Sequence, residues 1–329
     1  MQLSYQQKRA YRRKLMRARR QMSRTLTEFQ TPELFNTPEN SVLARDRAVG
    51  FLPVIQRVWP DPNAFLQASR ANRGIHSVWH NGLPIDFQVT RNRADVLLVV
   101  FHGALDLDAA LPIFPGANVA RGLGVARLAF TDPSLYLSPK LPLAWHAGNM
   151  HQPNLQQVYT WIINKVRRSI GAKRVILFGS SGGGFASLVQ AAAIPGATAL
   201  IANAQTDALL YHQDHVQTYI NLAWKGDRTA FVAANSHSAI EKIRKAKRVP
   251  RVFYMQNSTD TFHIKGHLNP FVREFGQDPE MRLLFGDWGE GHIAPPKELF
   301  HASLKAVVEN DPLTLSRLGF IPASSYTPA

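Results

Sequence analysis

The sequence contains no cysteine among its 329 residues, so it can form neither a disulfide framework nor a thiolate metal site. It also lacks any apolar run close to the roughly 20 residues that a membrane-spanning helix needs. No apolar segment with a small-residue cleavage site follows the first charged residues, so we expect no secretory leader and a cytoplasmic location. An apolar content of 45% over this length suffices for one large α/β core with an appendage.

Acidic residues are few beside basic ones, with 23 Asp and Glu against 38 Lys and Arg and a formal net charge of +15. Residues 1–24 contain nine of the basic residues and no acidic one. Apolar side chains recur there at helical spacing and continue to residue 29, at Tyr11, Leu15, Ala18, Met22, Leu26 and Phe29. The pattern predicts a basic amphipathic helix.

This helix over residues 1–29 has two interpretations. It either packs on the rest of the protein and keeps its charge for solubility, or it binds an anionic membrane surface or an acidic partner. In the second case the protein would be peripheral to the membrane. Nucleic acid is disfavoured as a partner, because no base-reading motif accompanies the charge.

Short apolar runs alternate with longer helical patterns after residue 75, which is typical of a doubly wound, mostly parallel sheet. Asn81-Gly82 predicts a hairpin between strands at 75–80 and 85–90. Further strands are expected at 96–101, 126–130, 174–178, 197–203, 251–256 and 281–285, with helices at 155–170 and 185–193. We therefore expect a basic helical N-terminal extension over 1–74 and one α/β domain over 75–329. Residues 204–248 are interpreted as a cap over the site.

The strand at 174–178 ends in Gly179-x-Ser181-x-Gly183, and a helical pattern follows at once. A strand, a tight turn and a helix in this order expose a serine hydroxyl as a nucleophile, and the glycines let the helix start close to the strand. Glycine-rich turns of this kind also bind phosphates. The motif therefore points to catalysis only if partners for Ser181 follow downstream.

A nucleophilic serine needs a base, and the base needs a carboxylate to orient it. Asp260 lies in the polar turn after the strand at 251–256, and His292 lies in the loop after the strand at 281–285. We interpret Ser181, Asp260 and His292 as a catalytic triad. Other candidates are Asp207, Asp287 and Glu290 for the acid and His267 for the base.

The strand at 96–101 ends in His102-Gly103-Ala104. This loop resembles the one that supplies a backbone oxyanion donor after an early strand of α/β-hydrolases, often in a His-Gly sequence. We assign the donors to the N–H groups of Gly103 or Ala104 and of Gly182, with His102 holding the loop. The segment 131–149 also follows a strand end, so Trp145 and His146 are predicted to contact substrate.

Two histidine pairs, His212 with His215 and His263 with His267, have the spacing of metal ligands. No cysteine and no His-Glu-x-x-His pattern accompanies them. We therefore predict no metal and no cofactor.

Over roughly residues 75–310 the chain resembles the α/β-hydrolase superfamily. The resemblance rests on four features in the expected order, which are His102-Gly103, Gly179-x-Ser181-x-Gly183, Asp260 and His292. The resemblance implies an eight-stranded, mostly parallel sheet and ester, thioester or amide chemistry through an acyl-enzyme. The His-Gly-Ala loop departs from the longer glycine run of many lipases and esterases. The surroundings are more weakly similar to bacterial hydrolases that act on acylated carbohydrates, including the hydrolase-like component of the accessory Sec system.

These observations predict a serine hydrolase, an esterase or deacylase that cleaves a carboxylic ester of a small molecule or a glycan. One alternative is a carbohydrate O-acyltransferase of envelope-polysaccharide biosynthesis, because the same triad serves both and the difference lies in the exclusion of water. The other is a hydrolase-fold binding or assembly protein without catalytic activity.

Overall fold

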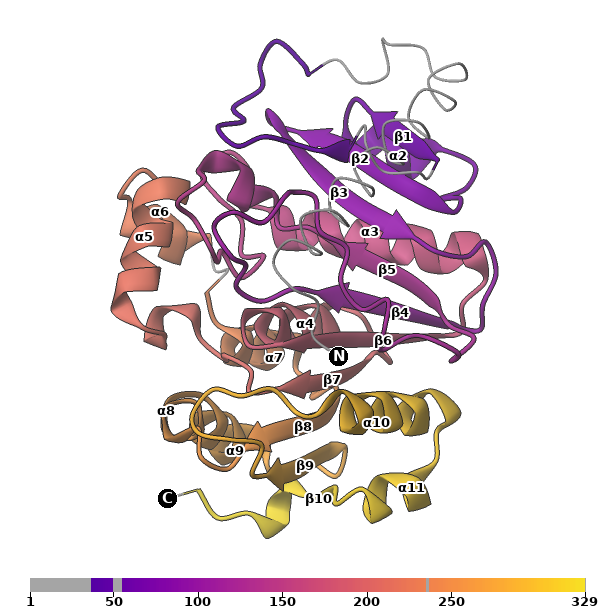
Figure 1. Cartoon of the computed structure of the whole chain (residues 1–329), viewed down its shortest axis with the longest axis vertical. Coiled ribbons are helices and arrows are strands. Elements are labelled where there is room, and N and C mark those ends of the chain that lie inside the picture. Colours follow the sequence, from indigo (N-terminus) through magenta and orange to yellow (C-terminus); the bar gives the residue numbers. More distant parts are fainter. Residues whose placement is uncertain (1–36, 50–54, 235–236, 329) are drawn as a thin grey trace, which may run out of the picture.

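The computed structural model describes residues 37–49, 55–234 and 237–328. The predicted basic helix over residues 1–29 lies outside the described residues. Figure 1 shows a central twisted sheet with helices on both faces. Within the described residues the sheet has 10 strands in the order β1-β2-β3-β5-β4-β6-β7-β8-β9-β10. The expected doubly wound α/β architecture is therefore confirmed.

Most neighbouring strands run parallel, but β3 is antiparallel to both its neighbours and β10 is antiparallel to β9. The strands are β1 Gln56–Trp59, β2 Gly74–His80, β3 Leu83–Val89, β4 Val96–Phe101, β5 Ala126–Phe130, β6 Arg174–Ser180, β7 Thr198–Ala202, β8 Arg251–Asn257, β9 Met281–Gly286 and β10 Ile321–Pro322. The 8 strands expected from the sequence correspond to β2–β9. The two edge strands were missed because they have only 4 and 2 residues, too few to show a period. β1 comes from the expected N-terminal extension, so the sheet begins before the boundary drawn at residues 74 and 75.

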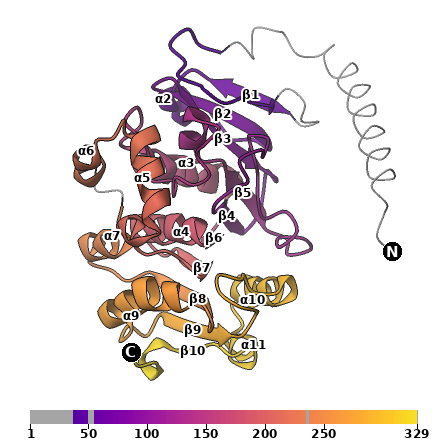
Figure 2. The ribbon, with the colours of Figure 1, turned by 60° about the vertical axis from the view of Figure 1, so that its left-hand side comes forward.

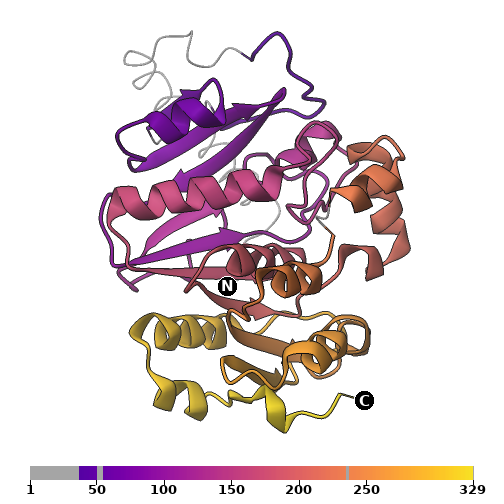
Figure 3. The same cartoon turned by 180° about the vertical axis from the view of Figure 1, so that it is seen from behind.

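The helices cover the two faces unequally. They are α2 Pro62–Gln67, α3 Leu155–Ile170, α4 Gly182–Ala193, α5 Gln213–Ala223, α6 Arg228–Ala233, α7 Ala239–Ala246, α8 Thr261–His263, α9 Asn269–Phe275, α10 Lys297–Glu309 and α11 Pro312–Arg317. In Figure 2, α4 and α9 lie on one side of the strands and α10 on the other. Figure 3 shows α3 lying across the face that α4 also covers. None of the helices in the described part of the chain is long and apolar enough to cross a bilayer.

Alternation along β4 divides the core in two. Leu97, Val99 and Phe101 belong to the cluster packed against α3 and α4, whereas Val96, Leu98 and Val100 belong to the cluster packed against α10 and α11. This is the period of two expected for a strand buried on both faces. On the α10 side, the crossover from β4 to β5 over residues 102–125 contributes loop residues and no helix. That part of the sheet is consequently less thickly covered.

The described part of residues 204–248, the segment expected to form a cap, contains three α-helices with different positions. α7 packs against α4 and so belongs to the helical layer on the sheet. α5 and α6 extend beyond that layer, at the left of Figure 1. Only the α5–α6 part of the segment therefore projects away from the sheet.

Candidate active site

Ser181 occupies the turn between β6 and α4, with φ 56° and ψ −124°. A non-glycine residue in this region of backbone space is strained, and such strain clusters at functional sites. The neighbouring glycines are required by close approach of the backbone. A Cβ on Gly179 would lie 2.3 Å from the Gly183 carbonyl, and one on Gly183 would lie 2.4 Å from the Phe101 oxygen. The motif therefore packs β4, β6 and α4 together beneath a turn whose Ser181 is partly exposed.

Asp260 follows β8 and caps the amino end of α8. One of its carboxylate oxygens lies 2.6 Å from Nδ1 of His292, and the carboxylate also contacts Nδ1 of His263 at 2.9 Å. The two imidazole rings stack with centroids 3.9 Å apart and planes 16° apart. Asp260 and His263 are buried, whereas the His292 side chain is 36% exposed. The structure thus joins the predicted acid and base, and it adds a second histidine to the acid.

The ionisation of this cluster follows from burial and hydrogen bonding. Burial by itself raises the pKa of Asp260, but the hydrogen bonds from His263 and His292 outweigh it and hold the pKa well below its usual range. Burial lowers the pKa of His263 more than the bond to Asp260 raises it, and the neighbouring His292 lowers it further. At neutral pH, Asp260 is therefore a carboxylate and His263 a neutral imidazole.

Ser181 reaches this cluster through an amide. Its Oγ accepts a hydrogen bond from Nε2 of Gln205 at 2.9 Å, and the same nitrogen lies 2.9 Å from Nε2 of His263. Since His263 donates from Nδ1 to Asp260, its Nε2 is the acceptor for the second amide proton. A continuous chain therefore runs from Asp260 through His263 and Gln205 to Ser181. Within the described residues no hydrogen bond joins Ser181 to His292 directly.

The loop that carries His292 is held from the ends of neighbouring strands. Nδ2 of Asn257 donates to the carbonyls of Gly289 and Gly291 at 2.8 and 2.6 Å, and Oδ1 of Asn257 accepts from the Trp288 N–H at 3.0 Å. Oγ1 of Thr259 binds the same loop through the N–H of Gly291 at 3.1 Å. These contacts place the exposed imidazole of His292 over the buried Asp260.

Gln205 and His263 were missed by the sequence analysis. Gln205 lies three residues after β7, where the carboxyl ends of parallel strands meet, and that position was the only available signal. His263 is three residues after Asp260, a spacing that puts both side chains on one face of a helix. The sequence analysis noted the metal-ligand spacing of His263 and His267 and predicted no metal there. In the structure, Nδ1 of His267 accepts from the Thr206 N–H at 3.3 Å, and burial lowers the pKa of His267 to about 3.

The predicted oxyanion donors lie beside the serine. A Cβ on Gly103 would be 3.5 Å from Cβ of Ser181 and 3.8 Å from the nitrogen of Gly182. No hydrogen bond among the described residues uses the N–H of Gly103, Ala104 or Gly182. His102 holds this loop, since its Nδ1 lies 2.7 Å from the Gly103 oxygen and its Nε2 accepts from Asp132 N–H at 3.0 Å. The arrangement leaves backbone donors free to bind a developing oxyanion.

Trp145 and His146, predicted as substrate contacts, lie behind the turn rather than on its open side. Each is 1% exposed. Cδ1 of Trp145 is 3.4 Å from the position that a Cβ on Gly182 would take, and Nδ1 of His146 lies 3.1 Å from the Tyr159 hydroxyl. Both side chains pack the interior in this structure, and neither offers surface to a substrate.

The competing acids form no hydrogen bond to a histidine within the described residues. Asp207 caps a short 3₁₀ turn by accepting from Leu209 N–H at 2.9 Å, and Asp287 accepts from Gly289 N–H at 3.2 Å. Among the described residues neither of them, nor Glu290, shares a hydrogen bond with an imidazole. Asp260 alone of the four candidates does.

One group in the described chain has the donor set for a metal ion. Asp260, His263 and His292 offer ligand atoms that all lie within 4.8 Å of one another. Those atoms already satisfy each other through the two Asp260 hydrogen bonds, so the cluster is complete as an acid with two imidazoles. The prediction that no metal takes part remains a prediction.

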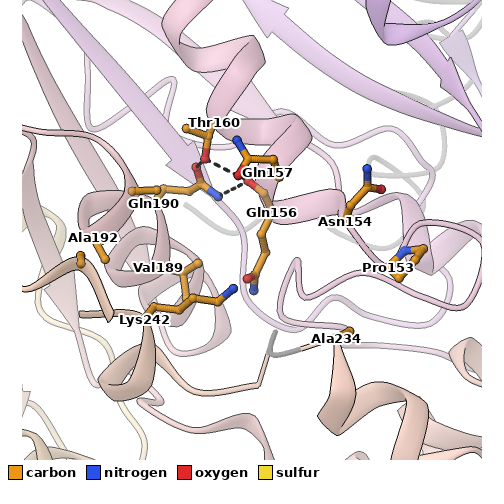
Figure 4. Close-up of a pocket in the computed structure, with 12 residues that line it drawn as sticks. Pro153, Asn154, Gln156, Gln157, Thr160, Val189, Gln190, Ala192, Ala234 and Lys242 are labelled. Carbon is orange, nitrogen blue, oxygen red and sulfur yellow. Dashed lines mark hydrogen bonds between the residues drawn. The ribbon is translucent and has the colours of Figure 1, made fainter. Parts of the chain in front are cut away.

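A pocket of about 460 Å³ lies elsewhere, between α3, α4 and α7. Figure 4 shows Thr160 and Gln190 joined across the helices, with the Thr160 hydroxyl 2.9 Å from Oε1 of Gln190. Burial lowers the pKa of Lys242 at its edge. None of the triad candidates lines this pocket, so it is separate from the cluster around Ser181.

No protein-family model matches this chain, and no curated protein matches it. Solved structures do match. The capsule O-acetyltransferase of Neisseria meningitidis serogroup A has a TM-score of 0.55 at 15% identity, over 70% of this chain and 95% of that chain. A variant of that enzyme in complex with CoA gives 0.54 at 14% identity, over 70% and 98%. A puromycin hydrolase variant gives 0.50 at 14% identity, over 72% of this chain and 39% of that chain. The chain therefore has the α/β-hydrolase fold, and at these identities the likeness shows the fold alone.

Proposed function

We propose that this protein is a serine hydrolase that cleaves a carboxylic ester through an acyl-enzyme on Ser181, with His292 as base and Asp260 as acid. The observation that carries the proposal is the 2.6 Å contact between Asp260 and Nδ1 of His292, at the sheet edge where Ser181 occupies a strained turn. Free backbone donors beside Ser181 support the same chemistry.

The carboxylate determines which nitrogen of His292 acts. Because Nδ1–H donates to Asp260, Nε2 is left unprotonated and can take a proton. The Ser181 Oγ accepts from Gln205, which leaves its own proton to be donated to a base. The proposal requires Nε2 of His292, whose side chain is 36% exposed, to approach Oγ when substrate binds, since catalytic hydrogen bonds often close only in the substrate complex.

The reaction then proceeds in two balanced steps. In the first step, Oγ of Ser181 attacks the ester carbonyl while His292 takes the hydroxyl proton. The resulting oxyanion binds the N–H groups of Gly182 and of Gly103 or Ala104. The alcohol then leaves with the proton from His292, and the acyl group stays on Ser181. Water next attacks the acyl-serine, giving its proton to His292. The acid leaves, and Ser181 recovers its proton.

His263 and Gln205 serve as positioning residues in this scheme. His263 donates from Nδ1 to Asp260 and accepts from Gln205 at Nε2, so neither of its ring nitrogens is free to take the proton from Ser181. Gln205 holds the serine rotamer by donating to Oγ. Two residues that never touch the leaving group therefore orient the nucleophile.

A second candidate is a carbohydrate O-acyltransferase, in which a sugar hydroxyl replaces water in the second step. The observation that favours it is the fold shared with the capsule O-acetyltransferase over 95% of that chain. A glycan ester would then be the substrate or the product. Both candidate functions are compatible with a cytoplasmic location. Both are also compatible with binding of residues 1–29 to an anionic membrane surface or an acidic partner.

The test is labelling of the intact protein with a fluorophosphonate probe. Label is expected on the parent chain and on Ser316→Ala, which changes an exposed serine of α11, and it should be absent from Ser181→Ala. Label that persists on Ser181→Ala would reject Ser181 as the nucleophile, and a parent chain that takes no label would favour a non-catalytic binding protein. Products from acetyl-CoA or an aryl acetate, with and without sugars, then separate the candidates, because only transfer to the sugar supports the acyltransferase.

A further inference from the structure

A pocket of about 740 Å³ opens beside the nucleophile on the α10 face of the sheet. Its wall includes Ser180, the residue before Ser181, and Lys297, five residues after His292. We infer that this pocket binds the acyl group of the substrate, and that the acyl group is an unbranched apolar chain longer than acetyl. The inference rests on the proposed function and names its substrate class.

The pocket exists because the β4–β5 crossover lacks a helix. Its floor is the sheet, where Gly116 approaches so closely that a Cβ there would lie 2.8 Å from Val100 Cγ2. Gly116 also has φ 86°, which favours glycine. Phe178 and Phe300 meet edge to face at 5.1 Å on the α10 side. Nδ1 of His301 lies 3.0 Å from the Val119 carbonyl, so the loop and α10 are fixed to each other.

The opposite side of the nucleophile is filled. Cδ1 of Leu143 lies 2.6 Å from where a Cβ on Gly182 would be, and Trp145 lies just behind it. Both side chains are buried. Buried side chains therefore fill the space beside Gly182, whereas strand alternation puts Phe178 and Ser180 on the open α10 face.

The lining favours a hydrocarbon chain over a sugar or an anion. Phe114, Pro115, Val119, Phe178 and Phe300 supply apolar surface. The charges on α10 that line it are one Lys297 and one Glu298, which select neither sign. A glycan would leave hydroxyls without partners against this surface. Each buried methylene should instead strengthen binding about fourfold.

The first experiment compares aryl acetate, butanoate, hexanoate and octanoate as substrates. For the parent chain, kcat/KM should rise about fourfold per methylene until the pocket is full. Val119→Trp should lower the ratio of octanoate to acetate kcat/KM towards one, because the indole fills the pocket. Val232→Trp, on the exposed part of α6, is the matched control and should behave as the parent. Equal rates along the series, or a profile that Val119→Trp leaves unchanged, would overturn the inference.

A binding experiment separates this inference from the proposed function. Octanoate titrated into Ser181→Ala by calorimetry should bind, and Val119→Trp in the same background should abolish the heat. Ala117→Trp is a second filling variant at an exposed wall position, in case Val119→Trp does not fold. Octanoate that fails to bind, or that binds the filled variants equally, rejects the acyl pocket even if esters are hydrolysed. Absence of Ser181-dependent labelling rejects the catalytic proposal instead.

Discussion

The backbone conformation at Ser181 leads to a prediction that distinguishes the conformational strain of the turn from the loss of the nucleophile. Replacing Ser181 with Ala or with Gly removes the hydroxyl in both cases, so both variants should be inactive. They differ only in the side chain that must adopt φ 56° and ψ −124°. Alanine keeps the strain of that conformation, whereas glycine adopts it without a Cβ clash.

The magnitude follows from two opposing effects. Strain at such a position costs of order 1–3 kcal/mol. Glycine raises the entropy of the unfolded chain and loses about 0.5–1 kcal/mol relative to alanine at an unstrained site. Ser181→Gly should therefore be more stable than Ser181→Ala by about 1 kcal/mol. At Ser180, which lies in β6 and has no positive φ, Gly should be the less stable by about 0.5–1 kcal/mol.

Urea unfolding followed by tryptophan fluorescence measures these four variants at constant pH. The quantity to compare is the difference in unfolding free energy between the Gly and Ala variants, which should have opposite signs at positions 181 and 180. The entropy that glycine adds to the unfolded chain is common to both positions and cancels in this comparison. If Gly is less stable than Ala at both positions and by the same amount, the turn stores no strain. The reasoning about the turn at Ser181 would then be wrong.

Three further predictions concern the acid, its second histidine and acid stability. Asp260→Asn should lower kcat by about 10⁴, because the amide favours the wrong tautomer of His292, and unchanged circular dichroism would show an intact fold. His263→Asn should lower kcat/KM less than His292→Ala does, since only His292 carries the proton; equal losses in ester assays would contradict this. Burial lowers the pKa of His76 to about 4, whereas the same imidazole in the unfolded chain has a pKa of about 6.5. As the pH drops from about 6.5 towards 4, the unfolded chain therefore binds a proton at His76 before the folded chain does, and the free energy of unfolding falls. The loss should reach about 2 kcal/mol near pH 5. Urea unfolding at pH 7 and pH 5 checks this, because the free energy of unfolding of His76→Phe should fall by about 2 kcal/mol less than that of the parent between these two pH values.

The sequence alone determined the elements whose signals are local. The strands expected at 96–101 and 126–130 and the helix at 155–170 have the bounds found in the structure, because each is a buried run or a helical stripe in its own right. The hairpin at Asn81-Gly82 forms with φ 50° and 83° at its two turn residues, as such a pair allows. The contact between Asp260 and His292 also followed from chain order, since parallel strands bring their carboxyl ends to one edge.

Tertiary structure alone decided what surrounds those residues. Whether Asp260 serves one imidazole or two, and whether Ser181 meets a histidine or Gln205, depends on distances across loops that no local pattern records. The burial of Trp145 and the open space on the α10 face likewise arise from packing between distant segments. Periodicity reports which face of an element is apolar, whereas the shape of a site depends on which side chains fill the space between elements.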